Sequence, residues 1–468
     1  MTCLNSSCSK FLEETSQSEL IPRSAESLNE FLLGSGYPGY SSGLNQGGLY
    51  FNDDIAMIKN TPTPGSFNVF TWQHNMIDPK SQKEKELSVF LWDRLYPFIQ
   101  TCNTVQDYLP KVTGTNEFKS YIAGQSKLLR AYYYFKLANF YGLPYNDTQS
   151  DRKTNLAVPL LIVGGVESAR KPRNTVEEVY SQIVKDLEDG ILLMDQSGQF
   201  HNKYRIGSEA GHLLASRVYL YTEKWNDVIR HADELLNNPS YKLEDLRTWG
   251  IANPIAKPVV GINSSETFWV FGSTSDVDPF QINERESYRL SPALVASFEE
   301  GDLRNGIYFS NRIQTKFPRV AFNQAPGQAF RIAEAYLNKA EALAQLYAQG
   351  NLQAGQQCIA VLNELREKRF SASQYVPLDL TDIGNKLLQY VRVERRRELF
   401  SEEDHRWFDL KRYGMPSIEH LYYSTETTVE RYILDQRDPA YLLPIPGTVK
   451  ALNSNIVPNP TIPIRQPK

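Results

Sequence analysis

The stretch Leu387–Gly414, LLQYVRVERRRELFSEEDHRWFDLKRYG, combines dense charge with apolar residues at helical spacing. It holds eight Arg, Lys and His residues and six Asp and Glu residues. Such a charge run usually forms a solvated helix face. Here aliphatic and aromatic residues direct part of the charge toward a core, where Arg and Glu side chains must be paired. We therefore expect a structural ion-pair network on two helices, Lys386–Phe400 and His405–Tyr413.

A glycosidase is the catalytic alternative for this stretch, because its candidate carboxylates Glu398, Glu402, Glu403 and Asp404 are close in sequence. A general acid needs a raised pKa, whereas the interleaved arginines lower the pKa of a carboxyl group. The six histidines are scattered and form no recognisable catalytic triad with Ser and Asp. These residues therefore favour a structural ion-pair network over a catalytic site.

Apolar residues at 3–4 spacing predict that most of the fold is α-helical. Two helix pairs with small residues at the expected crossing points, Ser208–Leu236 and Ala333–Leu365, resemble tetratricopeptide repeats. ETFWVF around Trp269 predicts a buried strand, and Tyr441–Pro446 predicts extended chain. The expected helices before the charged stretch are Ser24–Leu33, Glu84–Tyr108, Tyr121–Tyr141, Asn174–Met194, Ser208–Thr222, Trp225–Asn237, Gln328–Gln349 and Leu352–Arg369.

Composition and short motifs exclude several kinds of site. A net charge of −4 argues against nucleic acid as the main partner. The four cysteines lack metal-ligand spacing, and one Glu209-x-x-His212 pair is too little for a di-iron bundle. The GxGxxG match at Gly34–Gly39 follows an expected helix instead of a strand, so it does not indicate a dinucleotide site. No cofactor or metal is expected.

Several motifs together resemble the SusD/RagB family of nutrient-binding lipoproteins of Bacteroidetes. The charged stretch is similar to the family's C-terminal signature, through ER-x-x-EL from Glu394 and R-x-x-DL-x-R-x-G from Arg406. Four more segments resemble family motifs in matching order, and they are RAYYYFKLANFYGLPY (Arg130–Tyr145), Arg173–Tyr180, RIAEAYLNKAEAL (Arg331–Leu343) and LLPIPGTVKALNSNIVPNP (Leu442–Pro460).

This resemblance implies a mostly α-helical scaffold of about four tetratricopeptide-like helix pairs with long loop-rich insertions. It implies a single domain over 24–468, with an N-terminal part at 24–240 and a C-terminal part at 265–468. It also implies a surface protein without catalysis that delivers oligosaccharide, or in some members peptide, to a SusC-like TonB-dependent outer-membrane transporter. A tetratricopeptide scaffold that binds a protein partner is the alternative from another class.

The start of the chain resembles a bacterial lipoprotein. Leu4-Asn-Ser-Ser-Cys8 is similar to a lipobox, although no charged and apolar segments precede it. The following polar run, through Arg23, is typical of a tether, so we expect residues 1–23 to be a lipoprotein N-terminus that anchors the chain to the outer membrane.

Candidate ligand-binding residues are aromatic and polar side chains in the segments outside the repeats. Aromatic rings stack on the apolar face of a sugar, and Asn, Asp, Arg or His side chains reach its hydroxyl groups. Trp92, Trp225 and Trp407 lie on expected helices and are assigned to the core. The candidates are Trp72 with His74 and Asn75, Asp53 and Asp54 nearby, and Trp249 and Tyr288 with Asn283 and Arg285.

We predict that the mature native protein begins at an acylated Cys8. A single acyl chain binds membranes only reversibly, so we expect more than one chain on this residue. Mass spectrometry of the protein from the membrane fraction of its host tests this. A native N-terminus upstream of Cys8, or an unmodified thiol, would contradict it.

Overall fold

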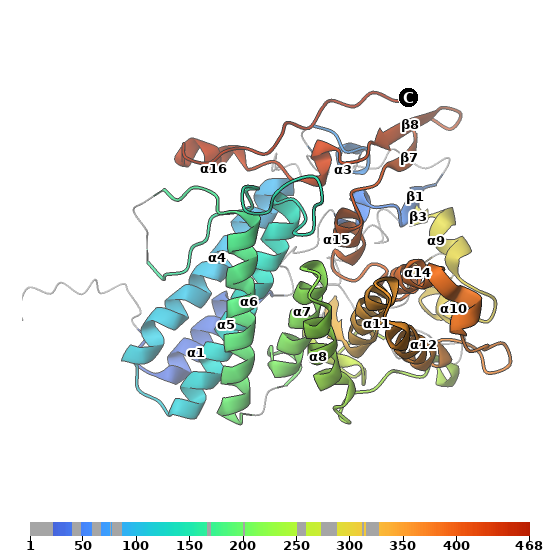
Figure 1. Ribbon diagram of the computed structural model, residues 1–468. Coiled ribbons are helices and arrows are strands. Elements are labelled where there is room, and N and C mark those ends of the chain that lie inside the picture. The colour runs from blue at the N-terminus through green and yellow to red at the C-terminus, as the bar shows by residue number, and fades with distance from the viewer. Residues whose placement is uncertain are drawn as a thin grey trace, which may run out of the picture.

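The structure is a computed structural model that describes residues 22–39, 48–58, 67–74, 76, 87–165, 170–199, 202–249, 259–272, 288–310, 313–314 and 327–468. Helices dominate the described part, as the apolar spacing predicts. They lie side by side from α1 and α4–α6 at one end to α11, α12 and α14 at the other (Figure 1). The longer helices are α1 (Ala25–Ser35), α4 (Leu87–Tyr108), α5 (Asn116–Tyr141), α6 (Val176–Ser197), α7 (Ser208–Tyr221), α8 (Trp225–Leu236), α11 (Ile332–Ala348), α12 (Leu352–Glu367), α14 (Leu387–Leu399) and α15 (His405–Arg412).

Short elements fill the segments between these helices. The short helices are α2 (Gly48–Phe51), α3 (Phe67–Phe70), α9 (Pro292–Ser297), α10 (Arg304–Ile307), α13 (Leu380–Ile383) and α16 (Gly447–Leu452). Antiparallel two-stranded sheets join β1 (Ile55–Met57) to β3 (Tyr288–Leu290), β2 (Thr267–Phe271) to β6 (Gln328–Arg331), β4 (Phe309–Ser310) to β5 (Ile313–Gln314), and β7 (Ile418–Tyr423) to β8 (Val429–Leu434). The 3-10 helices are η2 (Leu109–Lys111), η3 (Leu246–Thr248), η5 (Gly384–Lys386) and η6 (Pro439–Tyr441).

Local sequence signals set the helix boundaries. The Ser24 side chain accepts a hydrogen bond from Ser27 N and caps α1, as expected from its position. Thr175 and Glu178 form a capping box at the start of α6. Close packing of α5 on α6 depends on Gly124 and Gly190, since a Cβ on Gly124 would lie 2.7 Å from Met194 Cγ. The capping residues therefore set where α1 and α6 begin, and the two glycines set where α5 and α6 touch.

The structure corrects one prediction about secondary structure and adds a hairpin that was not predicted. The expected helix Gln328–Gln349 begins only at Ile332, because Gln328–Arg331 forms β6 and pairs with β2. All four β6 residues are buried, so their side chains carry no alternation that separates a strand from a helix. The β7–β8 hairpin is absent from the prediction, although buried Ile418, His420 and Tyr422 alternate with exposed positions. The predicted strand around Trp269 is confirmed as β2.

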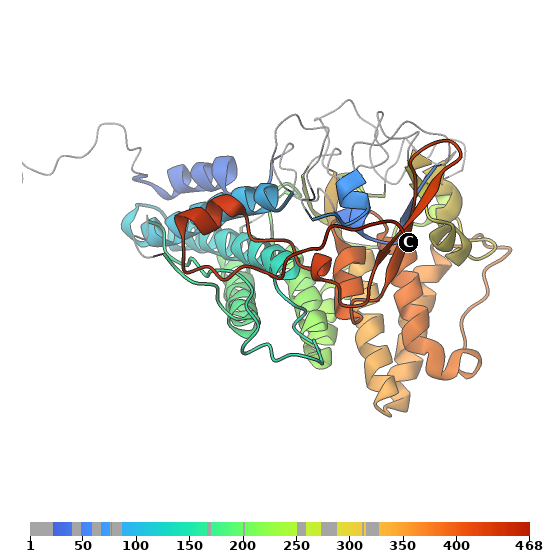
Figure 2. The same cartoon turned by 90° about the horizontal axis from the view of Figure 1, so that it is seen from above.

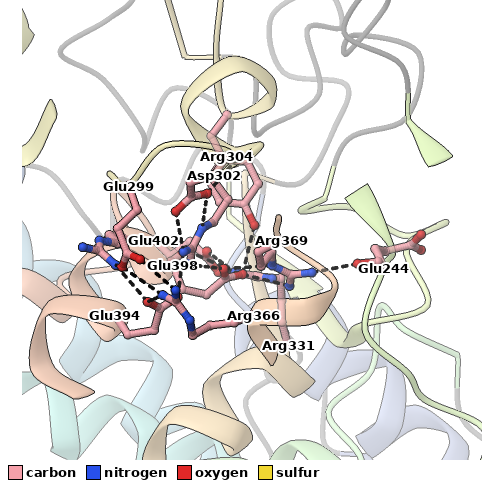
Figure 3. A network of polar contacts seen from close by, with 12 residues as sticks. Glu244, Glu299, Asp302, Arg304, Arg331, Arg366, Arg369, Glu394, Glu398 and Glu402 are labelled. Carbon is pink, nitrogen blue, oxygen red and sulfur yellow. Dashed lines mark hydrogen bonds and ion pairs between the residues drawn. The ribbon is translucent and has the colours of Figure 1, made fainter. Parts of the chain in front are cut away.

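The charged stretch forms a buried ion-pair network, as predicted. Glu398 of α14 is fully buried, and its carboxylate accepts hydrogen bonds from Arg304 Nη1 at 3.1 Å, Arg331 Nη2 at 3.2 Å and Arg369 Nε at 3.0 Å (Figure 3). Tyr308 donates its hydroxyl hydrogen to the same carboxylate at 2.9 Å. Burial acts to raise the pKa of Glu398, but the three guanidinium groups outweigh it and hold the pKa well below its ordinary value.

Neighbouring pairs extend this network across the helical part. Arg331 also binds Glu266 and Glu402, and Arg369 Nη2 donates to Glu266 Oε1 at 2.7 Å. Further along the stretch, Arg395 Nε donates to Asp409 Oδ2 at 2.8 Å, which joins α14 to α15. The network therefore ties β2, β6, α10, α12 and α15 to one helix, α14.

The C-terminal chain runs along one edge of the molecule. From α16 it crosses to a terminus beside the β7–β8 hairpin (Figure 2). Arg465 Nε donates to Trp72 O at 2.9 Å, and Arg465 N donates to Gln73 Oε1 at 3.1 Å. Residues 453–468 form no helix or strand, in agreement with an irregular C-terminal wrap. The last residues of the chain thus bind a segment near its start.

We predict that Glu398→Ala destabilises the fold by roughly 3–5 kcal/mol, because it leaves three buried guanidinium groups without their shared carboxylate. Arg395→Ala should have a comparable effect, since it leaves Asp409 with one cation fewer. Thermal and denaturant unfolding measure both.

Glu419→Ala is the matched control for these substitutions. Glu419 pairs with Arg431 on an exposed surface, where an ion pair contributes about 1 kcal/mol or less. A Glu398→Ala protein that unfolds like the wild type, or one that folds normally but loses ligand binding, would show that the network is not structural.

Candidate ligand-binding site

Three of the sequence-predicted segments meet beside one sheet. Met57 of β1 lies opposite Tyr288 of β3, and Phe70 of α3 packs on Tyr288 with ring centroids 5.1 Å apart. We call this region, residues 48–58, 67–74, 76 and 288–291 with the β7–β8 hairpin, the β1/β3 platform. It brings Asp53, Asp54, Trp72, His74 and Tyr288 into one region from distant parts of the sequence.

An imidazole between two aromatic rings holds the platform together. The His420 ring stacks between Phe70, at 4.1 Å between centroids, and Trp72, at 4.3 Å. Its Nδ1 lies 2.7 Å from Phe70 O and its Nε2 lies 2.9 Å from Asn52 O. Burial lowers the pKa of His420 to about 4, while the two carbonyl contacts act in the opposite direction. The His420 side chain of β7 thus holds two backbone positions, Asn52 just after α2 and Phe70 at the end of α3.

The structure corrects the expected positions of the two aromatic candidates on the platform. Trp72 is 0% exposed and its Nε1 donates to Phe51 O at 2.9 Å, so the indole offers no face to a ligand. Tyr288 is 1% exposed and packs against Tyr50 and Phe70. Both rings lie in the core, in contact with residues that are far away in the sequence. The sequence around each ring therefore does not reveal its burial.

The two candidate aspartates bind arginines of the charged stretch. Asp53 receives hydrogen bonds from Arg406 Nε and Nη2, both at 2.7 Å. Asp54 is fully buried and accepts a hydrogen bond from Arg396 Nε at 2.6 Å. Burial acts to raise the pKa of Asp53, but Arg406 outweighs it and lowers the pKa to about 2, whereas burial raises the pKa of Asp54. These aspartates attach the platform to α14 and α15.

The remaining candidates lie in different surroundings. His74 is exposed, and its Nδ1 lies 2.8 Å from Ile462 O of the C-terminal chain. Trp249 is half-buried and follows the turn Leu246–Thr248, which is bonded to Lys368 O at the end of α12. Asn75, Asn283, Arg285 and Cys8 lie outside the described residues.

Sequence reasoning missed three residues that build the platform: Arg396, Arg406 and His420. The arginines were assigned to a network, but a pairing across more than 340 positions leaves no local signal. His420 is detectable only through its place on the buried side of the β7 alternation.

The described residues provide no evident metal or acid–base centre. They contain no cluster of three or more His, Cys, Asp or Glu side chains arranged for a metal ion. His212 of the Glu209-x-x-His212 motif has its Nδ1 2.9 Å from His231 Nδ1. Of the candidate carboxylates, Glu398 has a lowered pKa, the reverse of a general acid, whereas burial raises the pKa of Asp404, which forms an ion pair with Lys136. Within the described ranges, no helix is long and apolar enough to cross a membrane.

Paired helices that carry a tightly anchored platform on one side define a mostly α-helical fold. One family model, described as starch-binding associating with outer membrane, matches residues 10–220, and a second, described as SusD family, matches residues 288–461. The chain belongs to the SusD/RagB family, which consists of binding proteins.

Individual relatives agree with this assignment. The chain is similar to SusD-like protein P2 of Formosa agariphila, with 23% identity over 424 residues and 79% of each chain covered. A SusD superfamily protein of Bacteroides vulgatus shares the fold with a TM-score of 0.76 at 20% identity, over 94% of this chain and 100% of that one. A laminarin-binding SusD-like protein matches with a TM-score of 0.62 at 20% identity, over 94% and 100% of the two chains.

We predict that the Asp53–Arg406 pair makes stability depend on pH. The pKa of Asp53 is about 2 in the folded state and about 3.8 when the chain is unfolded, so acid protonates the unfolded chain first. The stabilising contribution, on the order of 2 kcal/mol, is fully present above about pH 5 and is lost as the pH falls toward 2.

Denaturant unfolding of Asp53→Asn between pH 2.5 and 6 measures this effect. The difference from the wild type should shrink as the pH falls. Asp435→Asn is the control, because Asp435 pairs with Lys468 on the surface and both side chains are mostly exposed. An unchanged difference across the range would contradict the assigned pKa shift.

Proposed function

We propose that this protein binds nutrient oligosaccharides at the cell surface and delivers them to a SusC-like TonB-dependent transporter of the outer membrane. Membership of the SusD/RagB family is the observation that carries the proposal. The laminarin-binding relative and a putative sugar-binding protein of Bacteroides vulgatus, with a TM-score of 0.74 at 22% identity, support an oligosaccharide as the ligand.

The β1/β3 platform is the part of the structure that we assign to ligand binding. Its core is rigid, because His420, Arg396 and Arg406 fix it through contacts to backbone and carboxylate atoms. A rigid core beneath a binding surface reduces the ordering cost of binding. The platform leads in sequence directly into residues 59–66, 77–86 and 273–287, and the last range holds Asn283 and Arg285.

This arrangement divides the candidate residues by role. We infer that buried Trp72, Asp54 and Tyr288 support the site, whereas exposed His74, partly exposed Asp53 and the sequence candidates Asn75, Asn283 and Arg285 contact the ligand. We assign Trp249 no contact in the platform, since its turn is bonded to the end of α12.

We predict that calorimetry detects binding of neutral glucan oligosaccharides, and that His74→Ala and Arg285→Ala each lower the affinity about tenfold, as expected for the loss of roughly one hydrogen bond of 1.4 kcal/mol. Arg230→Ala is the control, because Arg230 lies on the exposed side of α8 in surface pairs with Asp227 and Glu188. The melting temperature of each variant verifies that it is folded.

A peptide ligand is the competing outcome of the same experiment. Tight binding of an oligopeptide mixture with no binding of any oligosaccharide would refute the proposed ligand class. Unchanged glucan affinity in both the His74→Ala and the Arg285→Ala proteins would refute the proposed site. Delivery is tested separately, since the native protein should co-purify with a large outer-membrane barrel, and its isolation without such a partner under mild detergent conditions would contradict this step.

A further inference from the structure

A polar pocket lies at the C-terminal end of α15. Its volume is about 310 Å³, at the lower end of the range of roughly 300–1,000 Å³ for small-molecule sites. We call it the turn pocket, because its walls are the segment Pro144–Gln149, Glu223 between α7 and α8, Arg392 of α14, the end of α15 through Met415, and Gln436 with Arg437. Every one of these segments belongs to the described chain.

Unusual backbone conformations gather around the turn pocket. Glu223, Met415 and Arg437 have φ angles of 60°, 53° and 59°, and Gly414 has a φ of 100°. Residues other than glycine seldom adopt this left-handed backbone conformation. Each one raises the conformational free energy by on the order of 1 kcal/mol or more. Among the residues that the structure describes, three of the seven non-glycine residues with this conformation line the same pocket. Backbone strain of this kind is typical of ligand sites.

Arg392 has unused hydrogen-bonding capacity at this pocket. Arg437 donates to both oxygens of Asp147 at 2.6 and 2.8 Å, and Arg412 donates to both oxygens of Glu341 at 2.7 and 2.6 Å. By contrast, Arg392 approaches Glu341 only through Nε at 3.5 Å, and its Nη atoms have no hydrogen-bond partner among the described residues. Its side chain is 33% exposed, so these donors are available to a ligand.

Arg392 is the cation of this pocket that has donors to offer an anion. Besides Arg392, the ammonium group of Lys411 is buried and donates to the carbonyl oxygens of Asn139 and Gly142, and no described carboxylate forms an ion pair with it. Of the two lining carboxylates, Asp147 is neutralised by Arg437. Glu223 remains at the exposed rim, where Asn146 donates to it at 3.0 Å. Burial lowers the pKa of Lys411 to about 7 and its ammonium group is used by backbone carbonyl oxygens, so the charge available to a ligand is the guanidinium group of Arg392, with the Glu223 carboxylate at the rim.

The other lining groups suit a hydroxylated ligand. The rim carries the exposed side chains of Thr148, Gln149 and Gln436, which can donate to and accept from hydroxyl groups. Stacking on an aromatic ring is not available, since the guanidinium groups of Arg392 and Arg412 cover the Tyr413 ring at 3.9 and 4.4 Å from its centroid. Recognition here depends on charge and hydrogen bonds.

We propose that the turn pocket is a second ligand site that binds the carboxylate of an acidic sugar, a uronic acid, through Arg392. A guanidinium group pairs with a carboxylate through two parallel hydrogen bonds, which matches the free Nη donors. The rim side chains bind the hydroxyl groups of the same sugar. This inference is independent of the proposed function, because it concerns a different part of the fold and a different ligand chemistry.

Calorimetry of the full chain with methyl β-glucuronide and methyl β-glucoside tests the proposal, since the two probes differ only in the carboxylate. We expect the glucuronide to bind and the glucoside to bind at least about tenfold more weakly, in line with the loss of a charge-assisted hydrogen bond. Affinity for the glucuronide should fall as salt is raised, because the attraction is partly exposed to solvent.

Arg392→Met should lower the glucuronide affinity at least about tenfold, while neutral oligosaccharide binding at the platform stays unchanged. Arg431→Met is the matched control, because Arg431 is 53% exposed on the β7–β8 hairpin and pairs with Glu419. N-acetylalanylalanine, a carboxylate without a sugar ring, should bind more weakly than the glucuronide.

Several results would overturn the proposal. They are no glucuronide binding to the wild type, equal affinity for the glucoside, equal or tighter binding of the acetylated dipeptide, and a folded Arg392→Met protein with unchanged affinity. Each can occur whether or not the platform binds neutral glycans, so failure here is distinct from failure of the proposed function.

Discussion

Three guanidinium groups share the carboxylate of Glu398, and the arrangement of the helical part depends on that convergence. Arg304, Arg331 and Arg369 come from α10, β6 and the end of α12. Each of these elements is therefore bonded to the same residue of α14. Charges buried in this way are costly unless each is paired and hydrogen-bonded. The network therefore stabilises one relative placement of these elements and penalises others.

The same helix connects the scaffold to the platform. On one side of α14, Glu394 and Glu398 bind the internal arginines, and on another side Arg396 reaches Asp54. The platform is thus attached to the most tightly paired element of the fold. Its aromatic residues can be buried completely because their positions are fixed from two directions, by arginines of the charged stretch and by His420 of β7.

Sequence patterns predicted the features of the structure that depend on residues close together in the chain. Apolar spacing gave the helices around Leu128 and Leu187, and the mixture of charge with Leu399 and Phe400 predicted a buried network. The patterns did not predict partners brought together by the fold. Trp72 is chemically well suited to a sugar platform, but its contacts with Phe51 O and with His420, 348 positions later, place it in the core. β6 escaped detection because a fully buried strand has no polar alternation.

The contact between Arg465 and the backbone of Trp72 bears on how the polypeptide reaches its native state. The two residues are separated by 393 positions, and Gln73 bonds Arg465 across 392. During synthesis, the platform cannot complete its hydrogen bonds until nearly the whole chain has been made. Contacts of such long sequence separation slow folding, because loop closure must precede them. A nascent chain therefore stays incomplete in this region, and a product truncated before Arg465 lacks these two hydrogen bonds.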